Sequence, residues 1–255
     1  MKQASLLLLL AFIIFSFSLC KKESAAKPCE FVDIRDGLIA YYPFNGNTND
    51  ESGNNNNAST KGGIQLTSDR SGNANKAYIF DGVDDYIDLA SNPSLTPVRL
   101  SIVLWFNMDN NGKMQLIGNN DNIDGYPGVY ATSLNYFSPG AHIAIRKPGT
   151  CDINTDAGYD PVVVANFNFV PGQWYCYAVT YDGLKVRIYV DGVIIKEQAT
   201  TVTSIAQCTG TIFKIGRWWN NEPLYFKGKM DEVRIYNRGL SQDEVKLLSA
   251  ICNNK

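Results

Sequence analysis

The loop at residues 45–57 is the strongest candidate for chemistry, because almost every side chain in it carries an oxygen atom. It reads Asn-Gly-Asn-Thr-Asn-Asp-Glu-Ser-Gly-Asn-Asn-Asn-Asn, which cannot build a hydrophobic core. Calcium takes about six to eight oxygen ligands from carboxylates, amides and backbone carbonyls. The loop therefore predicts a calcium site made by Asp50, Ser52, Gly53 and Asn54. The alternative is a turn whose Asp and Asn side chains bond their own backbone.

Three aspartates close together, Asp81, Asp84 and Asp85, form a second candidate cation site. The pair Asp81-Gly82 is also a turn signal, because glycine readily adopts the positive φ angle of a tight turn. We expect a structural turn here in preference to a metal site.

Two adjacent tryptophans, Trp218 and Trp219, suggest a different chemistry. The residues after them, including Asn220 and Pro223, indicate a loop between two strands. Because neighbouring residues of a strand point to opposite faces, we expect at least one exposed ring. An aromatic ring can stack on the CH groups of a sugar while nearby polar groups give directional hydrogen bonds. The pair therefore predicts a sugar site, and the alternative is that both rings fold back over the sheet.

Tyrosines from other loops are expected to join the rim of this sugar site. They are Tyr126, Tyr136 and Tyr159.

Short segments with a period of two surround these loops. Val186, Ile188 and Val190 alternate with Arg187 and Tyr189, as is typical of a half-buried strand. Asp-Gly pairs on either side of this segment predict tight hairpin turns. We therefore expect three successive antiparallel strands at 174–181, 184–190 and 193–198. Further short strands with regular turn signals predict an all-β sandwich.

One helix is expected near the C-terminus. Ser241 and Glu244 form a capping box, in which each side chain satisfies a free backbone N–H group at the start of the helix. Val245 and Leu248, and with them Cys252, would then face the sandwich. Strands do not alternate with helices along the chain, which argues against a parallel sheet.

Length, composition and charge limit the possible classes of function. The chain has 255 residues, 45% of them hydrophobic, which is enough for one large domain with a real core. The formal net charge is −2 and the sequence pI is near 5.5. This balance leaves no basic surface of the kind that binds nucleic acid.

The first twenty residues resemble a bacterial lipoprotein signal. Lys2 precedes an apolar run at 6–17, which is shorter than a membrane span, and Cys20 follows as the predicted lipidation site. The alternative is ordinary secretion without modification of Cys20, because Leu19 stands where such signals usually have a small residue. We expect a signal at 1–20, a polar tether at 21–30 and a domain at 31–255, located at the bacterial cell envelope.

Six cysteines are compatible with an oxidising compartment. If Cys20 carries lipid, an odd number remains, so at least one thiol does not pair within the chain. We predict a bridge from Cys29 to Cys252, which bracket the domain, and a second from Cys151 to Cys208, leaving Cys176 as a buried thiol. Sequence alone does not fix this connectivity.

Four motifs resemble a known family. They begin at Gly37-Leu-Ile-Ala-Tyr-Tyr-Pro-Phe, Ala77-Tyr-Ile-Phe-Asp-Gly, Trp174-Tyr-Cys-Tyr-Ala-Val and Phe226-Lys-Gly-Lys-Met-Asp-Glu-Val. Their order is that of the laminin G-like jelly-roll domains of bacterial exported proteins, in the concanavalin A-like lectin/glucanase superfamily. The resemblance implies an all-β, two-sheet antiparallel jelly-roll sandwich with one short C-terminal helix. It also implies that Asp231, on the last strand, joins the calcium site of the opening loop.

The chain departs from the family pattern at three places. Cys176 stands where relatives often have His, residues 147–161 form an inserted polar loop, and the Trp218-Trp219 pair is additional. Family members bind calcium, glycans or proteins, or space other domains, so the fold does not identify the ligand.

Catalysis is the weakest possibility. Glucanases of this superfamily place acidic residues alternately along one strand. The nearest match here is Asp231-Glu232, two adjacent acids that we expect to point to opposite faces of a strand. His142 is the only histidine, and no nucleophile motif accompanies it.

We therefore expect a non-catalytic, envelope-anchored, lectin-like module that recognises carbohydrate and is stabilised by calcium. The alternative is a structural or adhesion protein that binds another protein and has no glycan site.

Overall fold

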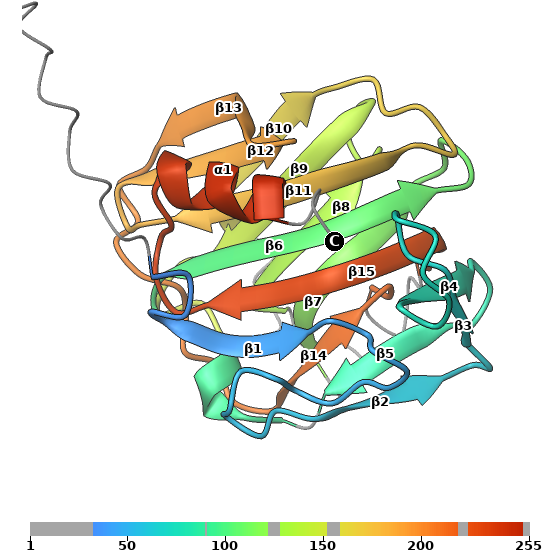
Figure 1. The fold of residues 1–255 in the computed structure, drawn as a ribbon. Helices are drawn as coiled ribbons and strands as arrows, with labels where there is room; N and C mark the ends of the chain where they lie inside the picture. The colour runs from blue at the N-terminus through green and yellow to red at the C-terminus, as the bar shows by residue number, and fades with distance from the viewer. Residues whose placement is uncertain (1–32, 90, 122–127, 152–158, 219–223, 252–255) are drawn as a thin grey trace, which may run out of the picture. The chain divides into compact units, whose positions relative to one another are not determined.

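The structure, a computed structural model, describes residues 33–89, 91–121, 128–151, 159–218 and 224–251. In this part of the chain, two antiparallel sheets pack into a sandwich with one α-helix (Figure 1). This confirms the predicted jelly-roll architecture.

The first sheet has eight strands, among them the longest of the fold. In spatial order they are β13 (Val193–Ala199), β12 (Lys185–Val190), β11 (Trp174–Tyr181), β6 (Leu100–Met108), β15 (Lys227–Tyr236), β4 (Ala77–Asp81) and β3 (Gln65–Thr67), and β1 (Leu38–Tyr42) also pairs with β15. The three strands expected between 174 and 199 are therefore confirmed. Asp191 and Gly192 have φ angles of 50° and 77°, as the predicted tight turn between β12 and β13 requires.

The second sheet has seven strands. In spatial order they are β10 (Tyr159–Asn166), β9 (Gly140–Arg146), β8 (Tyr130–Leu134), β7 (Met114–Asp121), β14 (Thr211–Ile215), β5 (Tyr86–Leu89) and β2 (Ala58–Lys61). β10 begins at Tyr159, so the polar loop predicted at 147–161 ends before Tyr159. Val162, Val163 and Val164 pair with β9, so β10 forms the edge strand of this sheet.

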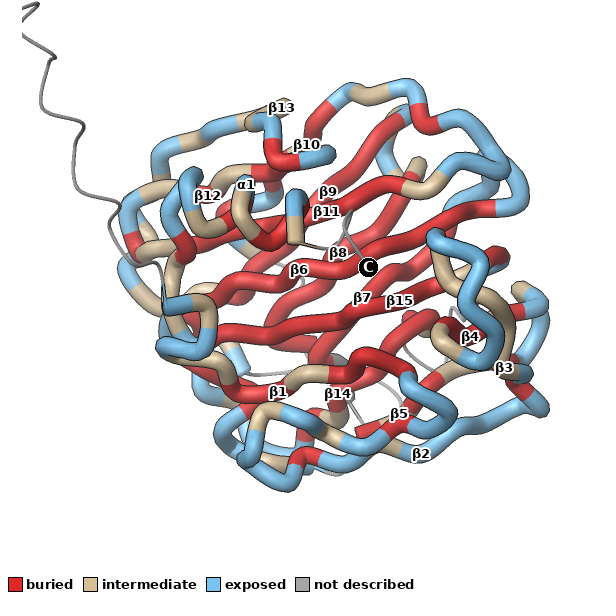
Figure 2. The backbone as a smooth tube through the Cα atoms, in the orientation of Figure 1, coloured by how far each residue is buried: buried red, intermediate tan, exposed pale blue. Residues whose placement is uncertain are grey.

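The core lies between the two sheets, and the central strands are buried along most of their length (Figure 2). Phe106, Phe80 and Phe226 meet edge-to-face, with centroids of Phe106 and Phe226 6.3 Å apart and those of Phe80 and Phe226 5.6 Å apart. Phe106 lies on β6, and Phe226 directly precedes β15, which is the neighbour of β6 in the sheet. These contacts therefore help to hold the eight-stranded sheet in register.

The helix α1 (Gln242–Ile251) covers the outer face of the eight-stranded sheet (Figure 1). Its predicted capping box is confirmed: the Glu244 N–H donates to Ser241 Oγ at 3.2 Å, and the Ser241 N–H donates to Glu244 Oε2 at 2.7 Å. Val245 and Leu248 pack with Trp105 in a second apolar cluster, which also holds the buried Cys176. None of the helices in the described ranges has the length and apolar character needed to cross a membrane.

Strand β15 pairs with two different strands along the same edge. Its first half, from Lys227, pairs with β4, and its second half, from Val233, pairs with β1. A bulge separates the halves: the register with β6 shifts after Asp231, and Glu232 has a φ angle of 55°. The bulge decides where these two acids point.

Candidate functional site

A hollow of about 450 Å³ opens at one end of the sandwich, between the β6–β7 turn, the β8–β9 turn and the segment after β10. We call it the end hollow. Its lining combines amide, aromatic and ammonium groups, among them Asn111, Lys113, Asn135, Tyr136, Phe137 and Asn168. Ligand pockets are hollows of this size with few, directional polar groups.

The β8–β9 turn is held in a fixed shape. Asn135 has a φ angle of 56°, which Asn tolerates better than most residues. Its Oδ1 accepts from the Gly140 N–H at 2.9 Å, and its Nδ2 donates to the Gly112 carbonyl at 3.3 Å. Because the turn is tied at both ends, the two aromatic residues that follow Asn135 project from a rigid support.

Tyr136 and Phe137 form an aromatic cluster with two buried rings. The Tyr136 centroid lies 4.9 Å from Phe137, 5.4 Å from His142 and 6.3 Å from Trp218. Phe137 also meets His142 edge-to-face at 4.9 Å. Phe137 remains 59% exposed, whereas Trp218 is 9% exposed. Trp218 and His142 therefore back the cluster, and Phe137 and the half-buried Tyr136 present it to solvent.

His142 acts here as a neutral packing and hydrogen-bonding group. It is 4% exposed, and burial lowers the pKa of its imidazole to about 4. Its ring nitrogens lie 3.1 Å from Ser133 Oγ. Among the described contacts of His142 there is no carboxylate, so Ser133 and His142 lack the acid that orients the base of a nucleophilic triad.

The strand register extends this polar region across the outward face of the seven-stranded sheet. Gln115 lies opposite Ser133, and Ser133 lies opposite His142, so the three side chains share one face. Gln115 is fully buried, and its Oε1 has no hydrogen-bond partner among the residues that the structure describes. Buried polar atoms are normally satisfied, so this outward row retains unused acceptor capacity beside the aromatic cluster.

A second outward row is built from small residues. Gly118 lies opposite Ala131, and Ala131 lies opposite Ala144. On its other side Gly118 lies opposite Lys214, which in turn lies opposite Asp88. These residues are buried: Ala131 is 0%, Ala144 6% and Lys214 4% exposed. We call the buried, outward-facing side formed by these two rows the polar face.

The predicted sugar-site residues fall on this side of the molecule only in part. Trp218 contacts Tyr136, as stated above, but it is buried, so it is not the exposed platform that we expected. Tyr159 lies on the polar face beside Arg146, whose guanidinium carbon is 4.6 Å from the ring centroid, and its hydroxyl donates to the Gly128 carbonyl at 2.9 Å. Trp219 and Tyr126 lie outside the described residues.

The opening loop is a dense set of hydrogen bonds. Asp50 Oδ1 accepts from the N–H groups of Tyr41 and Ser52, each at 2.9 Å. Asp50 Oδ2 accepts from the Ser52 hydroxyl and the Asn56 N–H, also at 2.9 Å. Asn54 donates through Nδ2 to the Leu38 carbonyl at 3.0 Å, and Gly53 has a φ angle of 95°. The carboxylate is thus fully engaged by donors of the chain itself, which is the turn chemistry considered above as the alternative.

Asp231, the fifth predicted calcium ligand, pairs with an arginine. Its carboxylate pairs with Arg70 at 2.5 Å, and the two side chains are 3% and 7% exposed. The Arg70 guanidinium also lies over the Trp105 ring, 4.8 Å from its centroid. Burial and then the charge of Glu232 raise the pKa of Asp231 to about 7, while Arg70 opposes this shift. With Asp50 held by amides and Asp231 by Arg70, the five predicted calcium ligands fit a metal cage poorly as they stand.

The expectation that Asp231 and Glu232 point to opposite faces was wrong, because the β15 bulge interrupts the alternation of the strand. Both line one hollow of about 190 Å³, together with Asn45, Asp69 and Asn73 among others. Glu232 Oε2 accepts from the Tyr41 hydroxyl at 2.8 Å and pairs with Arg234 at 2.6 Å. Each acid is therefore buried and held by an arginine.

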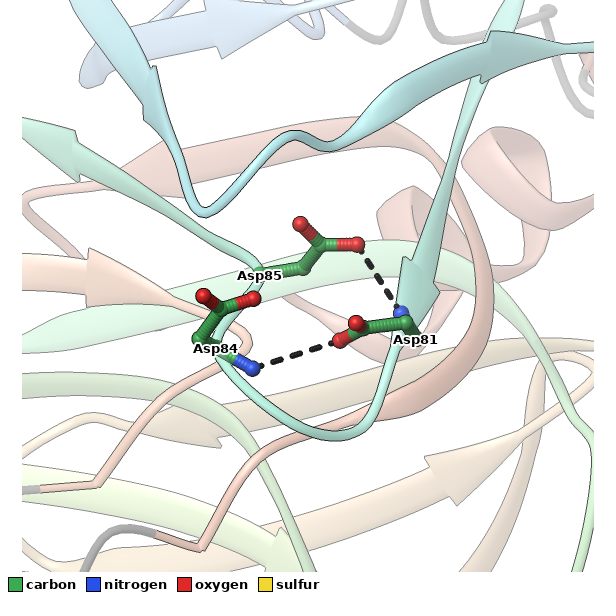
Figure 3. Close-up of side chains that lie close together, drawn as sticks. All are labelled: Asp81, Asp84 and Asp85. Atoms are coloured by element: carbon green, nitrogen blue, oxygen red, sulfur yellow. Dashed lines mark hydrogen bonds between the residues drawn. The ribbon is translucent and has the colours of Figure 1, made fainter.

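Asp81, Asp84 and Asp85 do converge, with ligand oxygens within 4.8 Å of one another (Figure 3). The turn accounts for their positions. Asp81 Oδ1 accepts from the N–H groups of Val83 and Asp84 at 2.7 and 3.3 Å, and Asp85 Oδ2 accepts from the Asp81 N–H at 3.0 Å. These backbone bonds, first that of Val83, hold the pKa of Asp81 below its usual range, and burial raises that of Asp85.

One predicted disulfide is confirmed. Cys151 and Cys208 are bridged with a Cα–Cα distance of 5.5 Å, joining the segment after β9 to the segment before β14. The predicted bridge between Cys29 and Cys252 and the predicted lipidation of Cys20 concern residues outside the described ranges.

Sequence reasoning missed Phe137, Lys113 and Gln115. Phe137 follows Tyr136 in a turn marked by Asn and Pro, and two adjacent aromatics in such a turn were the available signal. Gln115 carried no such signal, because only the register with Ser133 places it beside His142.

With this geometry described, comparison with known proteins identifies the family. A family model described as the concanavalin A-like lectin/glucanases superfamily matches residues 81–246. The chain belongs to this superfamily. The resemblance inferred from the four motifs is confirmed. No curated protein matches the chain.

Solved structures with the same fold include binding domains of larger proteins. Domain 4 of AbnA, a GH43 extracellular arabinanase from Geobacillus stearothermophilus solved in complex with arabinotriose, has a TM-score of 0.64 and 22% identity, covering 83% of this chain and 98% of that one. The binding domain of Paraclostridial Mosquitocidal Protein 1 has a TM-score of 0.64 and 18% identity, covering 87% and 54%. The binding domain of botulinum neurotoxin DC, in complex with SialylT, has a TM-score of 0.62 and 14% identity, covering 86% and 52%.

The chain spans about half the length of the two toxin domains, at 54% and 52%. At these identities the likeness shows a shared fold. Two of these neighbours are described as binding domains, and the third is a domain of an arabinanase.

Proposed function

We propose that the chain is a non-catalytic carbohydrate-binding module whose glycan site is the end hollow. The observation that carries this proposal is the aromatic cluster: an exposed Phe137 and a half-buried Tyr136, fixed from behind by buried rings, at the edge of a hollow of about 450 Å³. Aromatic rings stack on the CH faces of sugars.

The polar groups of the end hollow suit hydroxyl recognition. Asn111 and Asn168 present amides at its exposed rim, and an amide offers both donors and acceptors. A sugar hydroxyl likewise donates and accepts. Stacking on a ring combined with such directional bonds is how a shallow site distinguishes a sugar from a simple apolar ligand.

Binding to another protein has less support. The most exposed large apolar side chains among the described residues are Leu184 at 70%, Val83 at 68% and Val193 at 62%. They come from the β11–β12 turn, the β4–β5 turn and the start of β13. Protein interfaces are usually built on a contiguous apolar patch with aromatic anchors.

The non-catalytic assignment rests on Asp231 and Glu232, which are held by arginines and buried.

Two further parts of the proposal come from the sequence. Cys20 is the lipid anchor that holds the domain at the bacterial envelope, and the disulfide between Cys151 and Cys208 is in keeping with export. Structural calcium at the opening loop stays a prediction. The hydrogen bonds of Asp50 and the ion pair of Asp231 argue for a weak site, since a cation would have to displace them.

The test is titration of the purified protein against a panel of oligosaccharides, followed by the same titration with Tyr136→Ala and Phe137→Ala. We expect each variant to weaken binding by about tenfold or more, since about 1.4 kcal/mol corresponds to a factor of ten. Leu184→Ala removes an exposed apolar side chain, at 70% against 59% for Phe137, from the β11–β12 turn and serves as the control. Unchanged binding by both aromatic variants would remove the end hollow as the site, and a panel without any ligand would overturn the proposed function.

A further inference from the structure

A second set of aromatic rings borders the end hollow. Phe167 and Phe169, in the segment after β10, line it together with Tyr136 and Phe137 of the β8–β9 turn. Phe167 is half-buried, whereas Phe169 is 3% exposed. The Phe169 centroid lies 4.6 Å from that of Phe167 and 5.1 Å from that of Tyr175. Phe167 is therefore the accessible ring of this second set, and the core supports it from behind.

The β8–β9 turn also presents one accessible ring. Phe137 is exposed and Tyr136 is half-buried. The Lys113 Nζ lies over the Tyr136 ring, 5.3 Å from its centroid, and occupies part of the space beside it. Among the described lining residues, Phe137 and Phe167 are therefore the two aromatic rings most open to a ligand, and they come from separate segments.

The two segments are joined at their base. The Phe167 N–H donates to the Pro139 carbonyl at 3.3 Å. Gly140 has a φ angle of 134°, and a Cβ there would collide with the Ala165 carbonyl oxygen of β10. Only glycine allows the β8–β9 turn to approach β10 this closely. The relative position of the two rings is thus set before a ligand arrives, which reduces the entropy lost on binding.

Neutral hydrogen-bonding groups accompany the rings. Asn111 lies in the β6–β7 turn and Asn168 lies between Phe167 and Phe169, and both are exposed lining residues. Each amide offers two donors and an acceptor. The hollow therefore combines rings that require CH groups in a ligand with amides that require hydroxyl groups.

A pyranose meets both requirements fully only when its substituents are equatorial. The axial positions on both faces of the ring then carry only hydrogen, while the hydroxyls project from its edge. In an extended β-linked chain, neighbouring rings are turned over relative to one another, so aromatic rings on two segments meet both faces of the sugar. An axial hydroxyl would lie against one of these rings and lose its hydrogen bonds to water.

We propose that the end hollow selects neutral β-linked glycans whose pyranose rings have only equatorial substituents, as in the glucose and xylose series. Phe137 and Phe167 stack on the two faces of the chain, and Asn111 and Asn168 bind hydroxyls at the edges of its rings. This inference rests on the proposed function and adds the configuration of the sugar and Phe167 as a binding residue.

The experiment compares neutral tetrasaccharides of equal length that differ in configuration. Cellotetraose and xylotetraose have equatorial substituents only, whereas β-linked mannotetraose and galactotetraose carry an axial oxygen on each ring. Calorimetric titration of the wild type should show at least tenfold tighter binding of cellotetraose or xylotetraose than of the other two. A tenfold ratio corresponds to about 1.4 kcal/mol.

The role of Phe167 is tested with Phe167→Leu, which keeps an apolar side chain against the core but removes the ring. We expect fivefold or more weaker binding of the preferred tetrasaccharide and a smaller preference over mannotetraose. Val170→Ala shortens a 42% exposed side chain in the same segment that does not line the hollow, and it should change neither value. Melting temperatures check that both variants fold, and the comparison of tetrasaccharides on the wild type needs no variant.

Each outcome decides the matter. If mannotetraose or galactotetraose binds as tightly as cellotetraose and xylotetraose, the configuration inference is wrong and carbohydrate binding stays intact. Equal effects of Phe167→Leu and Val170→Ala would remove Phe167 from the site. If none of the four tetrasaccharides binds, the configuration inference fails, and the oligosaccharide panel with Tyr136→Ala then decides the proposed function separately.

Discussion

Arg70 and Asp231 form an ion pair in which the two side chains are only 7% and 3% exposed. Arg70 reaches this position from the loop between β3 and β4, whereas Asp231 lies at the bulge of β15. The pair therefore fixes a loop to the centre of the eight-stranded sheet. Removing one partner would leave the other charged group buried.

We predict that Arg70→Met lowers the free energy of unfolding by about 3–5 kcal/mol at pH 8, because the Asp231 carboxylate loses its counter-charge. Urea denaturation measures the change. The control is Lys185→Gln, since the pair of Lys185 with Glu197 is 43% and 39% exposed and should contribute less than about 1 kcal/mol. Adding Asp231→Asn to Arg70→Met should restore part of the loss, and equal effects of Arg70→Met and Lys185→Gln would contradict the prediction.

His142 predicts a pH dependence of stability. Burial lowers its pKa from 6.5 to about 4, so between these values the unfolded chain binds a proton that the folded protein does not. The contribution of His142 to the free energy of unfolding is complete above pH 6.5. It is lost as the pH falls towards 4, and the loss is at most about 3 kcal/mol. Chemical denaturation at pH 7, 5.5 and 4 should show a smaller decline for His142→Gln than for the wild type, and parallel declines would refute this account.

Trp218 is predicted to act by supporting Tyr136. Its exposure is only 9%, so Trp218→Ala should weaken glycan binding by loosening the cluster, and should also lower the melting temperature. Trp218→Phe keeps a ring behind Tyr136 and should retain most of the binding. If Trp218→Ala binds the glycan normally but has a lower melting temperature, Trp218 contributes to stability alone.

The disulfide between Cys151 and Cys208 closes a loop of 57 residues. Loop-closure entropy then suggests a stabilisation of up to about 4 kcal/mol. We expect Cys151→Ala/Cys208→Ala to lower the urea midpoint, and a reductant to lower that of the wild type by a similar amount. The reductant should have little additional effect on the double variant, and an equal effect on both proteins would place the sensitive bond elsewhere.

The calcium prediction is tested by thermal unfolding in chelator and in millimolar calcium. A calcium site at the opening loop should raise the melting temperature, because an ion that binds only the folded state stabilises it. Asp50→Asn should abolish the rise. Identical melting of the wild type in both buffers would leave Asp50 as the centre of a hydrogen-bonded turn.

Local features of the fold were predictable from the sequence. The Asp191-Gly192 turn and the Ser241–Glu244 capping box depend on residues adjacent or three positions apart, and both occur as predicted. The motifs that contain Asp50 and Asp231 also identified the family correctly. In each case a short stretch of chain contains all the interacting groups.

The tertiary structure decided the placement of side chains from distant segments. Nothing near Asp231 in the sequence announces Arg70 as its partner, and a one-residue bulge reversed the expected direction of Glu232. The end hollow needs Lys113, Tyr136 and Asn168 from three separate turns, which only the pairing of the strands brings together. The sequence by itself thus determined the sandwich and its turns, because these follow from local periodicity and backbone angles. The candidate glycan site was decided by strand register, which depends on long-range pairing and packing.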